Sequence, residues 1–179
     1  TTFRRYAISE NGDFWIARYH DNLYRSDTTL TRLSPVEFAN GPDYFKGDEI
    51  EALFFSKTDP ELLYVASTKK GLNAIDTRTL SVNHIWSLPK GVVLTDALLQ
   101  DDRWFWISTT TGLYRYDMQE GGSMRLTHSD DRFSISASYI FTTHVDKYGG
   151  LWVGTKDGGV SWLGNGQRYF EKVYFSGDI

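Results

Sequence analysis

A pattern that recurs four times constrains the fold of this chain more than any other feature of its sequence. Each copy has an aromatic anchor between two apolar residues, followed by a small residue. The anchors are Trp15, Tyr64, Trp106 and Trp152, at spacings of about 49, 42 and 46 residues. Six or seven residues after each anchor come a turn residue and an aliphatic one, namely Asn22-Leu23, Gly71-Leu72, Gly112-Leu113 and Gly159-Val160. Such a period indicates four copies of one supersecondary unit.

Each copy is predicted to be a group of four β-strands. Consecutive apolar residues, as in LLYVA and WFWIS, are typical of a strand buried on both faces. The turn residue, asparagine in the first copy and glycine in the others, is expected to have a positive φ angle. One further strand precedes each anchor strand and two follow it, and no helical period is present. The sequence therefore predicts an all-β fold of four-stranded antiparallel β-propeller blades.

The predicted array covers residues 1–179, with about four blades at approximately 1–33, 48–88, 92–128 and 137–175. At 179 residues the chain is long enough to bury a substantial core, and its 16% of aromatic residues argues against disorder. The net charge of −4 argues against a general nucleic-acid grip, which needs a basic face. No apolar run is long enough to insert into a membrane, and the absence of cysteine excludes disulfides.

Residues 146–162, DKYGGLWVGTKDGGVSW, carry the pattern most completely. The arrangement D-x-x-G-x-L-W-[IV]-G-T followed by G-[LV] resembles the two-component regulator propeller repeat. The fourth copy supplies Asp146, Gly149 and Leu151 to Thr155. The third copy has Arg103 in place of the glycine, and the second has Tyr64 in place of the tryptophan. The resemblance spans nearly the whole chain because the four copies stay in phase.

The resemblance implies a periplasmic sensor region of a bacterial membrane receptor, in which seven blades usually form each propeller. It also implies signal transduction and a small-molecule or oligosaccharide ligand, such as a breakdown product of a polysaccharide. Four blades would leave apolar blade faces open, so we expect this chain to be part of a larger propeller. The chain begins at Thr1 without methionine, which favours a trimmed or processed product or a fragment. A closed four-bladed ring, or pairing with a second copy of the chain, is the alternative.

No catalytic constellation, cofactor motif or metal site is evident. The histidines, His20, His84, His128 and His144, fall at different positions of their repeats and lack the spacing of metal ligands. Asp27, Asp76 and Asp117 recur at one position, which is typical of turn-capping residues. The anchors Trp15, Trp106 and Trp152 are predicted to lie in the core.

Candidate binding residues lie in the turns between the second and third strands of each blade, because such loops vary from copy to copy on a constant scaffold. The basic residues Arg18, Lys70 and Lys156 could meet a carboxylate, and Tyr19 could stack on a sugar ring. His20 lies in the same turn as Tyr19. These five residues form the predicted ligand site.

Three functions fit this sequence. A ligand-sensing propeller is favoured. A propeller enzyme, such as a lyase or glycosidase, would instead bring one histidine and acids together in a single channel pocket. A scaffold for protein contacts would show a broad face without a pocket.

Overall fold

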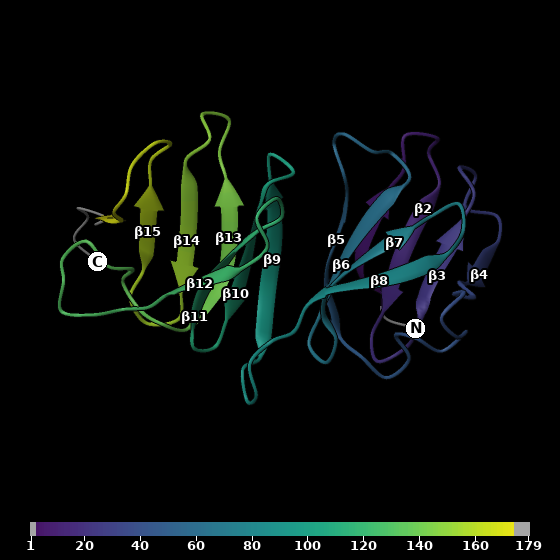
Figure 1. Cartoon of the computed structure of the whole chain (residues 1–179), viewed down its shortest axis with the longest axis horizontal. Coiled ribbons are helices and arrows are strands. Elements are labelled where there is room, and N and C mark those ends of the chain that lie inside the picture. The colour runs from purple at the N-terminus through teal and green to yellow at the C-terminus, as the bar shows by residue number, and fades with distance from the viewer. Residues whose placement is uncertain (1–2, 174–179) are drawn as a thin grey trace. The chain divides into compact units, whose positions relative to one another are not determined.

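The computed structural model describes residues 3–173, and within them the chain forms four antiparallel sheets of four strands each (Figure 1). The predicted all-β fold of four-stranded blades is confirmed. The ends of the predicted array and of its first and last blades, residues 1–2 and 174–179, lie outside the described residues. The chain divides into two compact units, residues 1–90 and 91–179.

The first unit holds two sheets whose strands are paired in chain order. The first sheet contains β1 (Phe3–Ile8), β2 (Phe14–Arg18), β3 (Leu23–Ser26) and β4 (Leu33–Pro35). The second contains β5 (Ile50–Phe55), β6 (Leu62–Ser67), β7 (Gly71–Asp76) and β8 (Ser81–Trp86). The first strands of the two sheets, β1 and β5, pack against each other. Each sheet is therefore one blade, and the two blades are neighbours.

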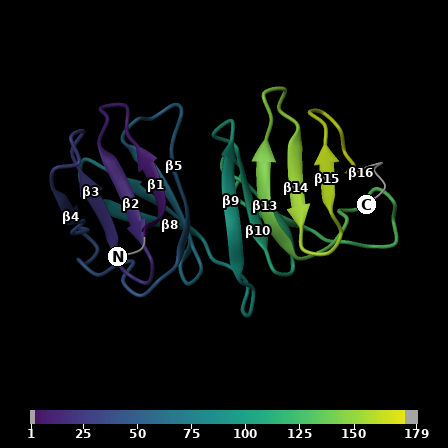
Figure 2. The ribbon, with the colours of Figure 1, turned by 180° about the vertical axis from the view of Figure 1, so that it is seen from behind.

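The second unit repeats this arrangement, with β9 packed against β13 (Figure 2). Its first sheet contains β9 (Leu94–Gln100), β10 (Trp104–Thr109), β11 (Gly112–Asp117) and β12 (Ser123–Leu126). Its second contains β13 (Ile140–Val145), β14 (Leu151–Thr155), β15 (Val160–Leu163) and β16 (Glu171–Val173). Residues 3–173 contain no helix that could cross a membrane.

Neighbouring blades pack face to face through a fixed pair of surfaces. We call the side of a blade that bears its anchor residue the anchor face and the other side the reverse face. In the first unit, Trp15 and Ala17 of the first anchor face share a core with Leu63 and Val65 of the second reverse face. In the second unit, Trp106 shares a core with Leu151 and Val153 in the same way. The repeat thus encodes both sides of one interface.

The exposure of Trp152 shows that the prediction that all anchor tryptophans lie in the core was wrong for this residue. Trp15 and Trp106 are 1% and 3% exposed, whereas Trp152 is 37% exposed. The indoles of Trp15 and Trp106 are covered by the reverse face of the next blade in the same unit. Trp152 belongs to the last blade of the chain, so no following blade covers it in residues 3–173. Its indole packs beside Trp162, at 6.2 Å between ring centroids.

The reverse face of the first blade is likewise open. Its side chains surround a hollow of about 670 Å³ whose apolar lining includes Tyr6, Ile8, Phe14, Ile16 and Leu33. Tyr6 is 68% exposed, and Ile8 and Leu33 are also solvent-exposed. In the second blade of the same unit the corresponding face is covered, so the open face has the character of an interface without its partner.

A β-bulge interrupts the first strand of every blade at the same register. The pairing with the second strand skips one residue in each case, namely Arg4, Glu51, Thr95 and Phe141. A bulge leaves one residue unpaired and redirects its side chain. In the first unit, the two redirected side chains, Arg4 and Glu51, meet across the blade interface.

The aspartates that recur in the sequence cap turns, as predicted. Asp76 and Asp117 each accept hydrogen bonds from two backbone N–H groups that follow them, and Asp27 accepts one from Thr29. Asp146 accepts from the backbone of Tyr148 and Gly150 and from Nε1 of Trp152, at 2.8–2.9 Å. Residues 146–150 therefore form a structural turn that leads into β14.

Candidate functional site

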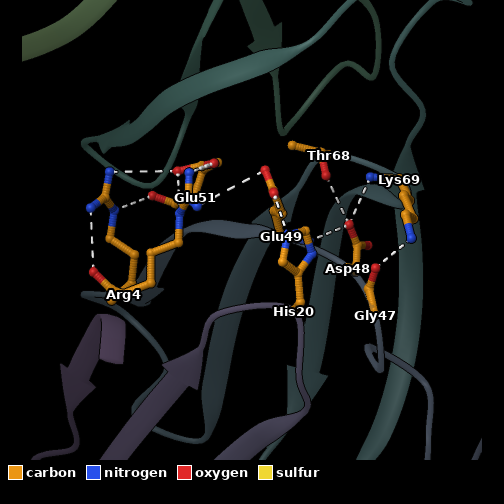
Figure 3. Close-up of polar contacts among 9 residues, drawn as sticks. Arg4, His20, Gly47, Asp48, Glu49, Glu51, Thr68 and Lys69 are labelled. Atoms are coloured by element: carbon orange, nitrogen blue, oxygen red, sulfur yellow. Dashed lines mark hydrogen bonds and ion pairs between the residues drawn. The ribbon is translucent and has the colours of Figure 1, made fainter. Parts of the chain in front are cut away.

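The candidate site lies at one end of the first unit. We call the entry end of a blade the end at which the chain enters its first strand; the turn between the second and third strands lies there too. In the first unit the entry end is formed by residues 19–22, 43–49 and 68–70. Figure 3 shows the side chains that meet there. The capping aspartates Asp27 and Asp76 lie at the opposite end, so structural and variable residues are separated.

Glu51 is the buried centre of the site. Its carboxylate accepts hydrogen bonds from Nε and Nη2 of Arg4, and Arg5 Nη2 lies 3.6 Å from it (Figure 3). The side chain of Glu51 is 2% exposed. Burial raises the pKa of Glu51, although the hydrogen bond and charge of Arg4 act in the opposite direction. The arginines of the neighbouring blade therefore oppose the effect of burial on this acid.

His20 and Glu49 link the two blades at the surface. Nε2 of His20 lies 3.1 Å from Oε1 of Glu49, and Nη1 of Arg4 lies 3.9 Å from the other carboxylate oxygen. His20 has a φ angle of 51°, so it takes the left-handed conformation that the sequence predicted for Asn22. Asn22 is instead buried, and its Nδ2 donates to the carbonyl of Pro42 at 2.6 Å.

Tyr19 packs against Arg4 and His20 at this surface. The Arg4 guanidinium lies over its ring at 5.3 Å from the centroid, and the His20 ring packs edge-on at 4.1 Å. Tyr19 remains 50% exposed. Because contacts with carboxylates hold both Arg4 and His20, the tyrosine ring presents an aromatic surface on a restrained support.

Asp48 fastens the loop before β5 to the turn after β6. Its Oδ1 accepts hydrogen bonds from the backbone of Glu49 and Lys69 and from Oγ1 of Thr68, at 2.8–3.0 Å. The backbone N–H of Thr68 also donates to the carbonyl of Glu49 at 2.9 Å. Thr110 and Lys156 make the same backbone bond to Val93 and Tyr139 in the second unit. This repeated bond brings the entry loop and the variable turn together in the second, third and fourth blades.

The structure places four of the five predicted site residues in the first unit and the fifth, Lys156, in the second. Arg18 is 3.0 Å from Asp21 and also donates to the Tyr24 hydroxyl, so its charge already has a partner. The backbone N–H of Asn22 is the main cause of the lowered pKa of Asp21. Lys70 places its ammonium 4.5 Å from the centroid of the Tyr44 ring. Lys156 lies in the second unit, with its ammonium 5.3 Å from the Tyr139 centroid.

Sequence reasoning identified Tyr19 and His20 but missed Arg4, Glu49 and Glu51. These three residues lie in or beside first strands, and only the bulges direct Arg4 and Glu51 toward each other. The acid-rich stretch DEIE at residues 48–51 was the available signal. Within residues 3–173, no group of three or more histidine, aspartate or glutamate side chains is arranged to hold a metal ion.

Comparison with known proteins identifies the repeat. Residues 134–157 match the family model described as Two component regulator propeller. This segment contains β13–β14 and the Asp146 turn. No curated protein sequence matches the chain significantly.

Several solved structures share the fold at low sequence identity. The extracellular domain of a protein described as a hybrid two-component system from B. thetaiotaomicron has 17% identity and a TM-score of 0.71, over 98% of this chain and 22% of that one. The extracellular domain of a protein described as a one-component system from the same organism has 15% identity and a TM-score of 0.70, over 90% and 21%. The chain thus spans about a fifth of the length of these two structures.

Enzymes share the same fold. A GH74 xyloglucanase from Xanthomonas campestris has 12% identity and a TM-score of 0.67, over 96% of this chain and 30% of that one. The blades themselves therefore do not distinguish a sensor from an enzyme.

Proposed function

We propose that this chain, whose residues 134–157 are a two-component regulator propeller repeat, is a section of the extracytoplasmic ligand-binding propeller of a bacterial signal-transduction receptor. The family match carries this proposal. The likeness in fold to extracellular domains of B. thetaiotaomicron receptors supports it. On this proposal the location is periplasmic, and the remaining blades belong to a longer protein.

The proposed ligand is a saccharide that binds at the entry end. A half-exposed tyrosine ring offers a stacking surface for the apolar face of a pyranose. Polar groups held by neighbouring carboxylates, such as His20 and Arg4, present fixed donors to hydroxyl groups. Arg18 is already neutralised by Asp21, which favours a contact with hydroxyl groups over a contact with a carboxylate. Lys70 of the first unit is the basic residue proposed to complete the contacts, and Lys156 is proposed as a separate contact residue of the second unit.

A catalytic role is the second candidate. The contact of 3.1 Å between His20 and Glu49, beside Tyr19, is the observation that favours it, because it brings a histidine and an acid together. A scaffold for protein contacts is the third candidate, and the open apolar hollow of the first blade favours it.

The test is binding of a panel of neutral and acidic oligosaccharides to the purified chain, measured by calorimetry. We expect at least one to bind and Tyr19→Ala to weaken that binding about tenfold, a loss of about 1.4 kcal/mol. Tyr148→Ala is the matched control, because Tyr148 is 75% exposed with a lysine over its ring at 4.9 Å.

The same incubations, analysed by chromatography, separate the candidates. Intact oligosaccharides support a binding module, whereas shortened products that disappear in His20→Gln favour the enzyme. If no saccharide binds in a way that depends on Tyr19, the proposed ligand class is wrong. In the intact receptor, Tyr19→Ala is expected to raise the saccharide concentration needed for a half-maximal response about tenfold, at an unchanged protein level.

A further inference from the structure

Ser87, His84 and Asn73 form a chain of hydrogen bonds in the second blade. Oγ of Ser87 lies 2.9 Å from Nε2 of His84, and Nδ1 of His84 lies 3.3 Å from Oδ1 of Asn73. Ser87 and His84 are exposed, whereas Asn73 is fully buried. The sequence did not reveal this arrangement, because His84 was considered only as a metal ligand.

The buried amide determines which nitrogen of His84 carries the proton. Nδ2 of Asn73 donates to the carbonyls of Lys70 and Gly71 at 3.1 and 3.3 Å, so Oδ1 is the atom that faces His84. The Tyr44 hydroxyl donates to the same oxygen at 3.1 Å. Because Oδ1 only accepts hydrogen bonds, Nδ1 of His84 must be the donor. Nε2 of the neutral ring is then free to accept the Ser87 proton.

A β-bulge brings the serine and the histidine together. In β8, Trp86 pairs with Leu72 and His84 pairs with Asn73, which leaves Ile85 as the additional residue. Residues three apart in a regular strand point to opposite faces, but one inserted residue restores a common side. Bulges occur frequently beside active sites because they redirect side chains in this way.

Gly71 allows the end of β8 to approach. A Cβ atom on Gly71 would lie 2.2 Å from the carbonyl oxygen of Trp86 and 3.1 Å from Cα of Ser87. Its φ angle of 63° is also one that favours glycine. The position of Ser87 therefore depends on a residue that belongs to the repeat pattern.

We propose that Ser87 is an activated nucleophile that accepts acyl groups from activated esters, with His84 as general base and Asn73 as positioning residue. A nucleophile within hydrogen-bond reach of a base, which a third group orients, is the arrangement that activates serine hydroxyls. Both reacting groups are exposed, so an ester can approach Oγ. This activity is independent of the proposed saccharide site.

The step balances without a cofactor. Oγ of Ser87 attacks the ester carbonyl carbon while its proton passes to Nε2 of His84. The bond between the carbonyl carbon and the leaving oxygen breaks, and His84 returns the proton to the departing alkoxide. Water, activated by the same nitrogen, then attacks the acyl-serine and restores the free hydroxyl.

The test uses p-nitrophenyl acetate with the purified chain, followed by intact mass and peptide mapping. We expect acetylation at Ser87, none in Ser87→Ala, and at least a tenfold slower reaction in His84→Ala. Added imidazole should restore the rate in His84→Ala, which a merely structural histidine would not allow. Ser81→Ala is the matched control, because Ser81 is an exposed serine at the start of β8 whose Oγ contacts Thr79 and not a histidine.

Acetylation of Ser87 no faster than that of Ser81, or an equal rate in His84→Ala without imidazole, would overturn the proposal. Circular dichroism of each variant establishes that it is folded. If His84→Ala fails to fold, His84→Gln gives the same comparison. Failure of saccharide binding leaves this result unaffected, because the reaction requires neither Tyr19 nor a sugar.

Discussion

Glu51 and Arg4 are expected to respond unequally to substitution. Burial raises the pKa of Glu51, so its ionised form opposes folding at neutral pH. Glu51→Gln removes that charge and should change the free energy of unfolding by less than about 1 kcal/mol. Arg4→Met leaves the buried carboxylate with the more exposed Arg5 and should cost about 2–3 kcal/mol. Urea unfolding at pH 7 measures both.

The double variant and the pH dependence provide the controls. In Arg4→Met with Glu51→Gln, most of the loss should be recovered, because no charge is left unpaired. As the pH falls through the raised pKa of Glu51 toward the ordinary value of 4.5, the folded protein binds a proton more tightly than the unfolded chain. Wild type should then gain stability relative to Glu51→Gln. A loss in that interval would contradict the assignment.

Asp146 has the opposite pH dependence. The hydrogen bond from Trp152, followed by that from the Gly150 backbone, lowers its pKa below the ordinary value of 3.8. Its contribution to stability is therefore present above pH 3.8 and is lost as the pH falls through the lowered pKa. Asp146→Ala should reduce the urea midpoint at pH 7, and its difference from wild type should shrink in acid.

Asp157→Ala serves as the control for Asp146, because Asp157 is an exposed acid in the turn at the other end of the same blade. Its midpoint should match that of wild type at both pH values. Equal changes in the urea midpoint for Asp146→Ala and Asp157→Ala would mean that the hydrogen bonds of Asp146 do not stabilise the fold.

At the scale of the strands, the turns differ in how much they depend on glycine. Gly71→Ala should destabilise the protein by at least about 2 kcal/mol, because the added Cβ meets the Trp86 carbonyl in addition to the unfavourable φ angle. Gly159 has a φ angle of 75° with open space around it. Gly159→Ala should cost only about 1 kcal/mol. Comparing the two free energies of unfolding separates the clash from the backbone strain.

The bulges are the second decisive feature of the strands. All four first strands contain one at the same register, and β8 contains another at Ile85. The first set creates the contact between Arg4 and Glu51, and the last creates the contact between His84 and Ser87. The Arg4–Glu51 contact and the His84–Ser87 contact therefore both form where regular strand pairing is interrupted.

At the scale of the whole molecule, equivalent anchors should have unequal energies. Trp15→Ala should cost about 3–5 kcal/mol, because the second blade covers the indole completely. Trp152→Ala should cost about half as much, because that indole lies on an open face. Urea unfolding followed by circular dichroism tests this prediction. Equal losses would show that Trp152 is covered in solution, for example by a second copy of the chain.

The open faces of the first and last blades agree with the greater length of the structurally similar proteins. The chain spans about a fifth of the length of the extracellular domains whose fold it shares, and its first and last blades each present a face that is covered elsewhere in the repeat. This agreement supports the prediction that further blades surround it in a longer protein.

The periodic part of this protein is determined by its sequence. Four anchors in phase predict four blades, because each repeat contains both sides of the interface between neighbours. Asp27, Asp76 and Asp117 could be recognised as capping residues, because a turn interacts with its own backbone over two or three residues. Tyr19 and His20 could be singled out because they lie in a turn that varies between copies.

Only the tertiary structure decided the rest. The exposure of Trp152 depends on which blade follows it, and the partners of Glu51 lie on a neighbouring blade 46 or more residues away in sequence. The meeting of His84 and Ser87 depends on a bulge that no residue pattern marks. Local interactions can be predicted from neighbouring residues, whereas these three features result from register and from packing between distant segments.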